Sequence, residues 1–471
     1  MHALAGNKDV VVKGLQDIDS RLAGNSQELR DHIAAVGGDG AGNVDSHIAV
    51  LQSRIGPTLQ QAASEPSHED AHYVSRFDAV GLFQSVLSDI FSNIPDLQGY
   101  GDKNVVWALV PIEKIVHDVS TFWHRVQNIR GQKQSLWSAL ITELMQLPAM
   151  DFRAPFPAGV PDVKPLPEGT PIVLLADWGG DNDAARKVAG VVQQHHATAG
   201  IHLGDIYYGG TRQECESFLR LWPFGPNPAE GSSYALNGNH EMYSGGEYYF
   251  NLVLPSFKQP QSFFCLENDH WRIIGLDTAY GNSRLKPASP EDPIAPQWNW
   301  LLGLLRDKSG RANILLTHHQ PVSAHREEWN DSQSFRAEIE EVLSMDGIGG
   351  DAIFGWFFGH EHRCAAYKDT ETRYNARLIG NGCIPHVMQK ENAADPGCTP
   401  VAFFNKRETS PGSGVAVSSF AELNFNGPIL DITYVDEDNC AWGAEQWNSQ
   451  SGRLGGVQFI EFDGLTHAAG S

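Results

Sequence analysis

Five short polar segments stand out because each follows a run of apolar residues typical of a β-strand. Their aspartate, asparagine and histidine side chains are the oxygen and imidazole ligands that hard and borderline dications prefer. Strand ends in an α/β sheet share one edge, so ligands far apart in sequence can meet there. The segments are Asp177-Trp-Gly179, Gly204-Asp-Ile-Tyr-Tyr208, Gly238-Asn-His-Glu241, Leu316-Thr-His-His-Gln-Pro321 and Gly359-His-Glu-His362.

The region around these segments alternates between strand and helix patterns. Apolar runs predict strands over 172–176, 201–203, 233–236, 312–316 and 352–358, with an antiparallel pair over 262–266 and 271–276. Helices are expected over 184–197, 213–222, 295–308 and 334–345. This alternation favours an α/β fold, a layered β-sandwich with flanking helices, in a domain that spans 172–390.

The C-terminal part, 391–471, begins within a polar loop expected over about 389–414. Three period-two runs follow over 420–425, 429–434 and 440–447, separated by turn residues. Such runs predict a β-meander that completes the second sheet of the sandwich.

The first 150 residues are expected to form an all-α region, because apolar residues such as Leu15, Ile18 and Leu22 recur at helical spacing. Further helical runs are expected over 47–63, 77–94 and 105–147. These helices are the candidate surface for an oligomer or partner contact. Residues 151–171 are dense in proline, which disfavours helix and sheet pairing, so they are interpreted as a linker.

Composition excludes several classes of protein. The chain has 471 residues, a formal net charge of −23 and a pI near 5.2, so a general grip on nucleic acid is not expected. Neither a secretory signal nor an uninterrupted apolar span of membrane length is visible. The six cysteines are scattered, which favours free buried thiols over disulfides and a cytoplasmic location.

The ordered series of five segments resembles the calcineurin-like metallophosphoesterase superfamily over about residues 170–390. The superfamily has a histidine ligand where this chain has Gly179, and Tyr208 stands three residues after Asp205. This combination resembles the purple acid phosphatase branch, in which a tyrosinate binds ferric iron. The resemblance therefore implies two metal ions, iron paired with iron, zinc or manganese.

The resemblance also implies which side chains hold the ions. The branch places one ligand in His-x-Pro, which favours His319 over His318, and His318 is then interpreted as a supporting or core residue. Asp205 would bridge the two ions. The first ion would be held by Asp177, Tyr208 and His362, and the second by Asn239, His319 and His360.

The implied chemistry is hydrolysis of a small phosphate ester by a metal-bridging hydroxide. His240 would assist the leaving group, and His325 is either a substrate-facing histidine or an exposed loop residue. Glu241 and Asp277 could orient ligands. Phosphomonoesters are the favoured substrates. One alternative is a phosphodiesterase acting on a nucleotide, a cyclic nucleotide or a phospholipid headgroup, and another is a hydrolase targeted to a partner assembly by its N-terminal helices.

Overall fold

The structure is a computed structural model that falls into two compact units. One comprises Met1–Phe152 with Tyr243–Gly245, and the other comprises Arg153–Met242 with Gly246–Ser471. The expected helical run over 105–147 lies almost entirely outside the described residues. Those are 6–36, 44–65, 73–92, 140–142, 144–145, 152–326, 330, 333–368, 373–384, 394–451, 456–460 and 466–467.

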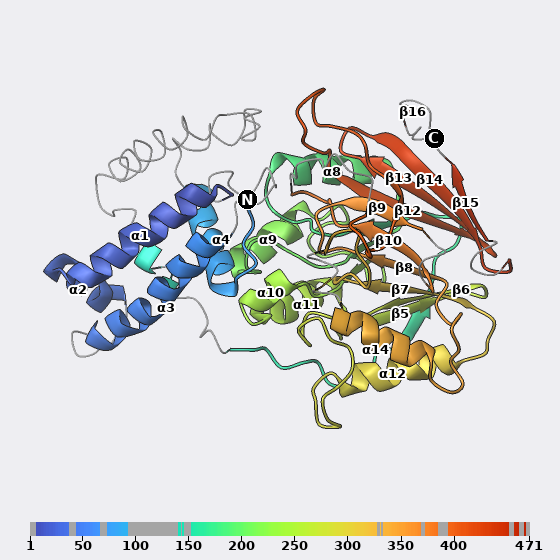
Figure 1. Ribbon diagram of the computed structural model, residues 1–471, viewed down its shortest axis with the longest axis horizontal. Coiled ribbons are helices and arrows are strands. Elements are labelled where there is room, and N and C mark those ends of the chain that lie inside the picture. The colour runs from blue at the N-terminus through green and yellow to red at the C-terminus, as the bar shows by residue number, and fades with distance from the viewer. Residues whose placement is uncertain are drawn as a thin grey trace. The chain divides into compact units, whose positions relative to one another are not determined.

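The described part of the first unit is helical, which confirms the expected all-α region (Figure 1). It contains α1 (Lys8–Gly24), α2 (Gln27–Val36), α3 (Val44–Ser64) and α4 (Asp78–Ser92). The apolar face predicted from Leu15 onward is divided between α1 and α2, because Asn25 adopts the left-handed conformation at φ 43° and ends α1. Its N–H donates to the Arg21 carbonyl, a common way to close a helix.

The second unit is built on two β-sheets, and this confirms the predicted layered sandwich (Figure 1). In the first sheet, β1 lies at one edge and β11 at the other. The spatial order is β1 (Val163–Pro165), β5 (Phe264–Glu267), β6 (Trp271–Gly275), β7 (Ala312–Thr317), β8 (Gly355–Phe358), β10 (Asn375–Ile379), β9 (Cys364–Tyr367) and β11 (Val401–Phe404).

The second sheet joins the early strands to the C-terminal meander through the antiparallel pairing of β2 with β12. The expected completion of the sandwich by the C-terminal strands is therefore part of the observed fold. Its order is β15 (Val457–Ile460), β14 (Cys440–Asn448), β13 (Ile429–Asp436), β12 (Ser419–Asn426), β2 (Ile172–Leu175), β3 (Ala199–His202) and β4 (Ser233–Ala235), with β16 (Thr466–His467) paired to β14.

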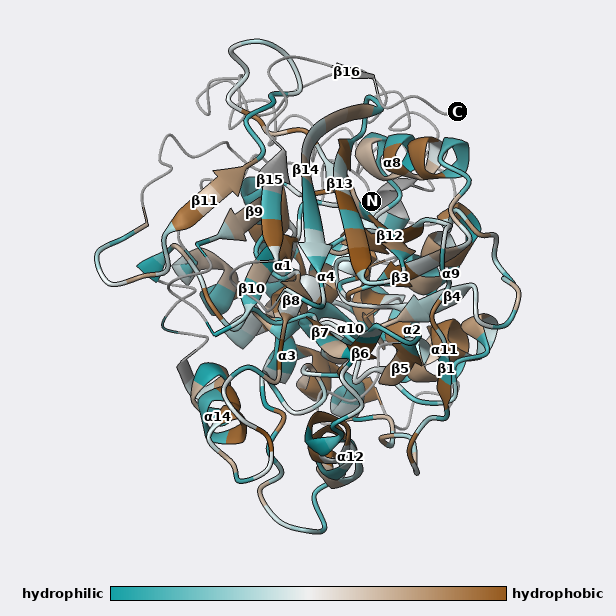
Figure 2. Cartoon of the chain, turned by 90° about the vertical axis from the view of Figure 1, so that its right-hand side faces the viewer, coloured by the Kyte–Doolittle hydropathy of each residue, from teal (hydrophilic) through white to brown (hydrophobic). Residues whose placement is uncertain are grey.

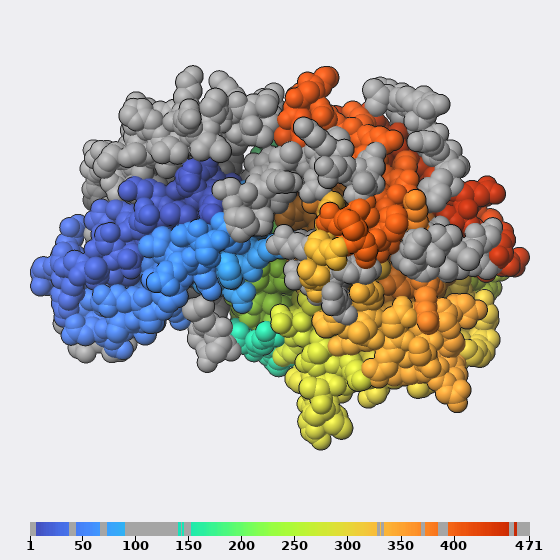
Figure 3. Space-filling view, viewed as in Figure 1, coloured from blue at the N-terminus to red at the C-terminus, as the bar shows by residue number. Residues whose placement is uncertain are grey.

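Period-two burial explains how the first sheet serves two cores. Ile314 and Leu316 of β7 face the second sheet and pack in the core between the sheets. Leu315 points the other way, into a second core with Trp298 of α12 (Ala295–Arg306) and Phe335 of α14 (Gln333–Leu343). Both helices carry mixed apolar and polar residues and lie at the surface of this unit (Figures 2 and 3).

Helices also flank the second sheet. They are α8 (Asp183–Gln194) and α9 (Arg212–Leu221), and Phe218 of α9 packs edge-to-face on His202 of β3 with ring centroids 4.9 Å apart. Because helices cover the sheets from outside, the strand ends are the parts of the sandwich that remain to form a site.

Two strands correct the sequence interpretation. The proline-rich segment was expected to avoid sheet pairing, but Val163 and Pro165 pair in parallel with Cys265 and Glu267. An edge strand tolerates proline because only one side of it must supply hydrogen bonds. Likewise β11 lies inside the expected loop over 389–414, where it pairs with β9 at the opposite edge of the same sheet.

All six cysteines are free and buried, as predicted. Among the described helices, none combines the length and hydropathy needed to cross a membrane.

Candidate metal centre

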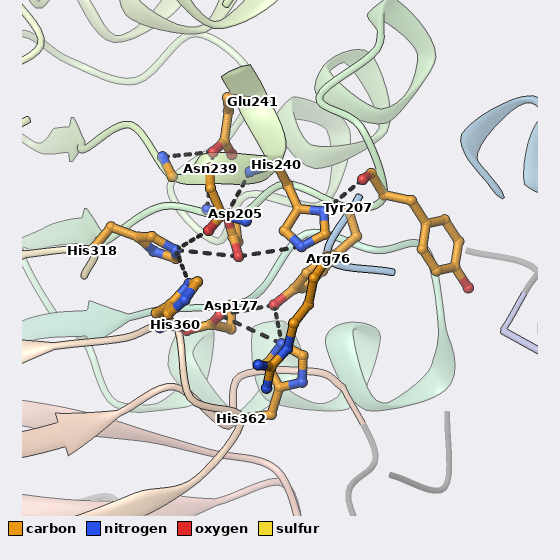
Figure 4. A network of polar contacts seen from close by, with 12 residues as sticks. Arg76, Asp177, Asp205, Tyr207, Asn239, His240, Glu241, His318, His360 and His362 are labelled. Carbon is orange, nitrogen blue, oxygen red and sulfur yellow. Dashed lines mark hydrogen bonds and ion pairs between the residues drawn. The ribbon is translucent and has the colours of Figure 1, made fainter. Parts of the chain in front are cut away.

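The five polar segments meet where strands of both sheets end (Figure 4). From the second sheet, Asp177 follows β2, Asp205 follows β3, and Asn239 follows β4 as the first residue of the short helix α10 (Asn239–Tyr243). From the first sheet, His318 follows β7, and the segment containing His360 follows β8. The two sheets thus contribute opposite sides of one cluster.

Within the described residues, two overlapping groups of side chains have the spacing to hold metal ions. Asp177, Asp205 and His318 form one group, and His318, His319 and His360 form the other. In each group the potential ligand atoms lie within 4.8 Å of one another. The groups share His318, so they describe a single extended site.

The Asp205 carboxylate is at the centre of this site and is almost completely buried. Its Oδ1 accepts a hydrogen bond from the backbone N–H of His240 at 3.0 Å. Its Oδ2 lies 3.3 Å from Nε2 of His318 and 3.8 Å from Nε2 of His240, without a hydrogen bond from any described residue. Burial tends to raise the pKa of Asp205, but the imidazoles of His318 and His240 outweigh it and hold this pKa below its usual range.

Asp177 lies on the side of the cluster formed by the first polar segment. Its Oδ1 accepts a hydrogen bond from the Tyr207 hydroxyl at 2.8 Å, and its Oδ2 accepts one from the backbone N–H of His360 at 2.9 Å. His362 Nε2 is 3.8 Å from Asp177 Oδ1. Complete burial raises the pKa of Asp177 well above its ordinary value, so a nearby cation would favour the ionised form.

His318, which the sequence interpretation made a supporting or core residue, is completely buried beside the candidate ligands. Its Nδ1 lies 3.0 Å from the Leu203 carbonyl, which leaves Nε2 facing the site. That Nε2 is 3.0 Å from Oδ1 of Asn239 and 3.2 Å from Nδ1 of His360. His318 is therefore a candidate ligand beside His319, and the choice of His319 as the ligand stays a prediction.

The two tyrosines that follow Asp205 also differ in what they contact. The Tyr207 hydroxyl lies between the Asp177 carboxylate and Nε2 of His362, at 2.8 and 3.0 Å. Tyr208 contributes its carbonyl, which accepts a hydrogen bond from Nδ1 of His240 at 2.6 Å. Ligation by the Tyr208 phenol stays a prediction, and Tyr207 joins the candidates for the first ion.

Three close approaches explain the glycines in these segments. A Cβ at Gly238 would lie 2.2 Å from Oδ1 of Asp205, and one at Gly359 would lie 2.5 Å from Oδ2 of Asp177. At Gly380 it would lie 2.0 Å from the carbonyl of Glu361. A side chain at Gly238 or Gly359 would displace a carboxylate, and one at Gly380 would displace the backbone beside His360 and His362.

Glu241 braces the two loops that carry Asp205 and Asn239. Its Oε2 accepts hydrogen bonds from the backbone N–H groups of Asp205 at 3.1 Å and Gly238 at 2.6 Å, and its Oε1 accepts one from Ile206. Burial, followed by the charge of Asp205, raises the pKa of Glu241 to about 8. The expected orienting role of Glu241 thus has a structural basis.

Asp277 braces a third loop, after β6. Its carboxylate accepts hydrogen bonds from the backbone of Ala279 and Tyr280 at 3.0 and 2.9 Å, and burial raises its pKa to about 6. The next residue, Thr278, places its hydroxyl 2.8 Å from Nδ1 of His319. Sequence reasoning missed Thr278, although a polar pair directly after a strand was a usable signal.

The two histidines predicted to act on substrate have different surroundings. His240 is buried with its Nε2 near Asp205. His325 is half-buried, and its backbone N–H donates a hydrogen bond to the Ser323 hydroxyl at 3.0 Å. A substrate-facing role for His325 stays a prediction.

The residues at this site fit a metal centre. Carboxylate and amide oxygens and imidazole nitrogens suit iron, zinc and manganese. The buried Oδ2 of Asp205 accepts no hydrogen bond from the described residues and lies 3.3 Å from Nε2 of His318, so a bound cation would stabilise its charge.

Comparison with known families agrees with this geometry. Residues 170–364 match the family model for calcineurin-like phosphoesterases. The matched segment contains all the predicted ligand positions and His240. No curated protein sequence matches the chain.

Several solved structures are similar to part of this chain at low identity. GAP50, described as the anchor in the inner membrane complex of Plasmodium, matches at 15% identity over 63% of this chain and 89% of that chain, with a TM-score of 0.39. The purple acid phosphatase PPD1 from yellow lupin matches at 13% identity over 63% and 55%, with a TM-score of 0.38. Vps29 from Chaetomium thermophilum matches at 8% identity over 63% and 97%, with a TM-score of 0.27.

Proposed function

We propose that this domain hydrolyses phosphate monoesters with the help of two metal ions. The observation that carries the proposal is the position of Asp205, whose buried Oδ2 lies in one cluster with the Asp177 carboxylate and the His318 imidazole. We propose that Asp205 bridges the two ions, since a carboxylate between two neighbouring sets of ligands can hold an ion pair.

The donors divide into two sets around Asp205. Asp177 and His362 with Tyr207 or Tyr208 would hold the first ion, for which iron is proposed. Asn239 and His360 with His318 or His319 would hold the second, which we propose to be iron, zinc or manganese. When bound, such an ion pair activates water and neutralises charge on the phosphoryl oxygens.

The contribution of His240 follows from its hydrogen bonds. Its Nδ1 faces the Tyr208 carbonyl at 2.6 Å, so Nδ1 carries the proton and Nε2 points toward the carboxylate of Asp205. Protonated at Nε2, the imidazole can give a proton to the leaving oxygen or bind the phosphoryl group.

Substrate class is tested by comparing a phenyl phosphate monoester with a bis-phenyl phosphodiester, with iron, manganese and zinc added. Asn239→Ala removes a proposed ligand, whereas Asn251→Ala alters an exposed asparagine of the same unit and serves as the control. We expect a monoester preference that is lost only in Asn239→Ala. A diester preference with the same dependence on Asn239 would replace the phosphatase by a phosphodiesterase.

The N-terminal helices support a second proposal, because they form a compact unit of their own. We propose that this unit provides the contact for an oligomer or a partner in the cytoplasm. Deletion of residues 1–150 should leave phosphatase activity unchanged and abolish the assembly detected by size-exclusion chromatography with light scattering. Loss of activity without any change of assembly would contradict this role.

A further inference from the structure

The adjacent histidines 318 and 319 differ in which ring nitrogen carries the proton. Nδ1 of His318 lies 3.0 Å from the Leu203 carbonyl, which can only accept a hydrogen bond. Nδ1 of His318 must therefore be an N–H, which leaves Nε2 as the ring nitrogen that can bind a metal ion by giving up its proton. Nε2 faces Asp205, Asn239 and His360, the other candidate ligands.

The surroundings of His319 lead to the opposite tautomer. The Thr278 hydroxyl is completely buried and lies 2.8 Å from Nδ1 of His319. The other described contact of this hydroxyl oxygen is with the backbone N–H of His319, at 3.3 Å, which is itself a donor. A buried hydroxyl proton needs an acceptor, and Nδ1 of His319 is the acceptor within reach.

With the Thr278 hydroxyl donating to Nδ1, the neutral His319 ring carries its proton on Nε2. A ring nitrogen of His319 lies within 4.8 Å of ligand atoms of His318 and His360, so the ring borders the metal cluster. A nitrogen that carries a proton cannot also donate a lone pair to a metal. His319 would then present an N–H to whatever oxygen occupies the centre.

We infer that His319 is a hydrogen-bond donor to a phosphoryl oxygen of the substrate, that Thr278 is the positioning residue that sets its tautomer, and that His318 is the metal ligand. The donor role rests on the proposed phosphate-ester function. A fixed, neutral donor aimed at developing negative charge stabilises the transition state without having to titrate.

The tautomers are tested directly in the full-length protein with ¹⁵N-histidine. Two-bond ¹H–¹⁵N spectra distinguish protonated from bare ring nitrogens, and His318→Gln and His319→Gln assign the signals. We expect His319 to carry its proton on Nε2 and His318 to carry one on Nδ1, with the Nε2 signal of His318 shifting when Zn²⁺ is added. A bare Nε2 on His319, or its shift on Zn²⁺ addition in place of His318, would overturn the assignment.

Measurements of metal and phosphate binding distinguish a metal ligand from a hydrogen-bond donor to phosphate. His318→Ala should lose Zn²⁺, whereas His319→Ala should keep the wild-type Zn²⁺ content and bind inorganic phosphate about tenfold more weakly in calorimetry. His319→Gln retains an amide N–H and should recover part of that affinity. Thr278→Val keeps the shape of threonine and should weaken phosphate binding less than His319→Ala. Loss of Zn²⁺ in both His319 variants, or unchanged phosphate affinity in His319→Ala, would refute the inference.

Failure of the proposed function has a different signature. If the wild-type protein binds Zn²⁺ and phosphate but hydrolyses no ester, the hydrolase proposal fails while the donor role stands on the binding data. If hydrolysis is intact, kcat in His319→Ala should fall by about 10²-fold with a much smaller change in KM. A metal-replete wild type that binds no phosphate would overturn the donor role itself.

Discussion

Replacement of Gly238 by alanine should disable the metal centre through a single methyl group. The added Cβ would lie 2.2 Å from Oδ1 of Asp205, 2.4 Å from its backbone nitrogen and 2.7 Å from Oε2 of Glu241. Ordinary contact begins near 3.4 Å, so Asp205 would have to move by about 1 Å.

The neighbouring groups cannot absorb this shift cheaply. Glu241 is held by backbone N–H groups on both loops, including those of Asp205 and Gly238. Overpacking of this kind costs about 1–3 kcal/mol of unfolding free energy. A displacement of about 1 Å in a positioned group lowers the rate by about 10²-fold. We therefore expect Gly238→Ala to fold with reduced stability, to bind metal poorly and to lose nearly all hydrolysis.

Gly303→Ala is the matched control for the same chemical change. Gly303 is exposed in α12, and a methyl group added there would meet no neighbouring group within 4 Å. Alanine in a helix should stabilise the protein by about 0.5–1 kcal/mol without affecting activity. Urea unfolding, metal analysis and monoester hydrolysis on both variants provide the test. A Gly238→Ala protein with wild-type metal content and rate would refute the packing argument.

Three further perturbations test other parts of the structure. The buried carboxylate of Glu445 accepts hydrogen bonds from the Arg377 guanidinium at 2.7 and 2.8 Å. Arg377→Met leaves this carboxylate without its cation, so the unfolding free energy should fall by about 3–5 kcal/mol. A loss below about 1 kcal/mol would contradict this. The hydrogen bond to Glu422 raises the pKa of His195, so the stabilisation of the fold by this pair should be complete below about pH 6.5 and disappear as the pH rises through the folded-state pKa. The difference in unfolding free energy between wild type and His195→Gln should shrink over that rise. A constant difference would exclude the linkage. Tyr207→Phe removes the hydroxyl that contacts Asp177 and His362, so iron content and any visible phenolate-to-iron absorption should decrease; unchanged absorption would return the ligand role to the next tyrosine in the chain.

The strand ends could be predicted from sequence because burial and hydrogen bonding there depend on local pattern. Short apolar runs before Asp177 and Asp205 correspond to β2 and β3, whose parallel pairing brings both carboxylates to one edge. The same reasoning predicted that the C-terminal meander would complete the sandwich. The local pattern was sufficient because β2 and β3 are completely buried, mostly apolar runs and the meander strands alternate between buried and partly exposed residues.

Neighbouring residues of the same type could not be distinguished in this way. Whether His318 or His319 faces the ligands depends on Leu203 and Thr278, which approach from other strands. The choice between the two tyrosines after Asp205 likewise depends on contacts across the site. A spacing rule taken from a family motif cannot register such long-range contacts.

Edge strands were the other feature that could not be predicted from the sequence. Val163 in β1 is exposed, and its segment is rich in proline, so no local pattern indicated pairing. Its place in the sheet depends on β5, which is about 100 residues later in the chain.

The most direct test of the metal centre is the metal-to-protein ratio of the purified chain and of Asp205→Asn, measured by elemental analysis beside monoester hydrolysis. Asp205 is the carboxylate proposed to bridge the ions, and the amide of asparagine keeps its size while removing its charge. We expect two ions per wild-type chain, with both bound metal and hydrolysis falling sharply in the variant. A wild-type chain that binds no metal, or an Asp205→Asn variant that keeps both ions and full activity, would contradict the binuclear centre.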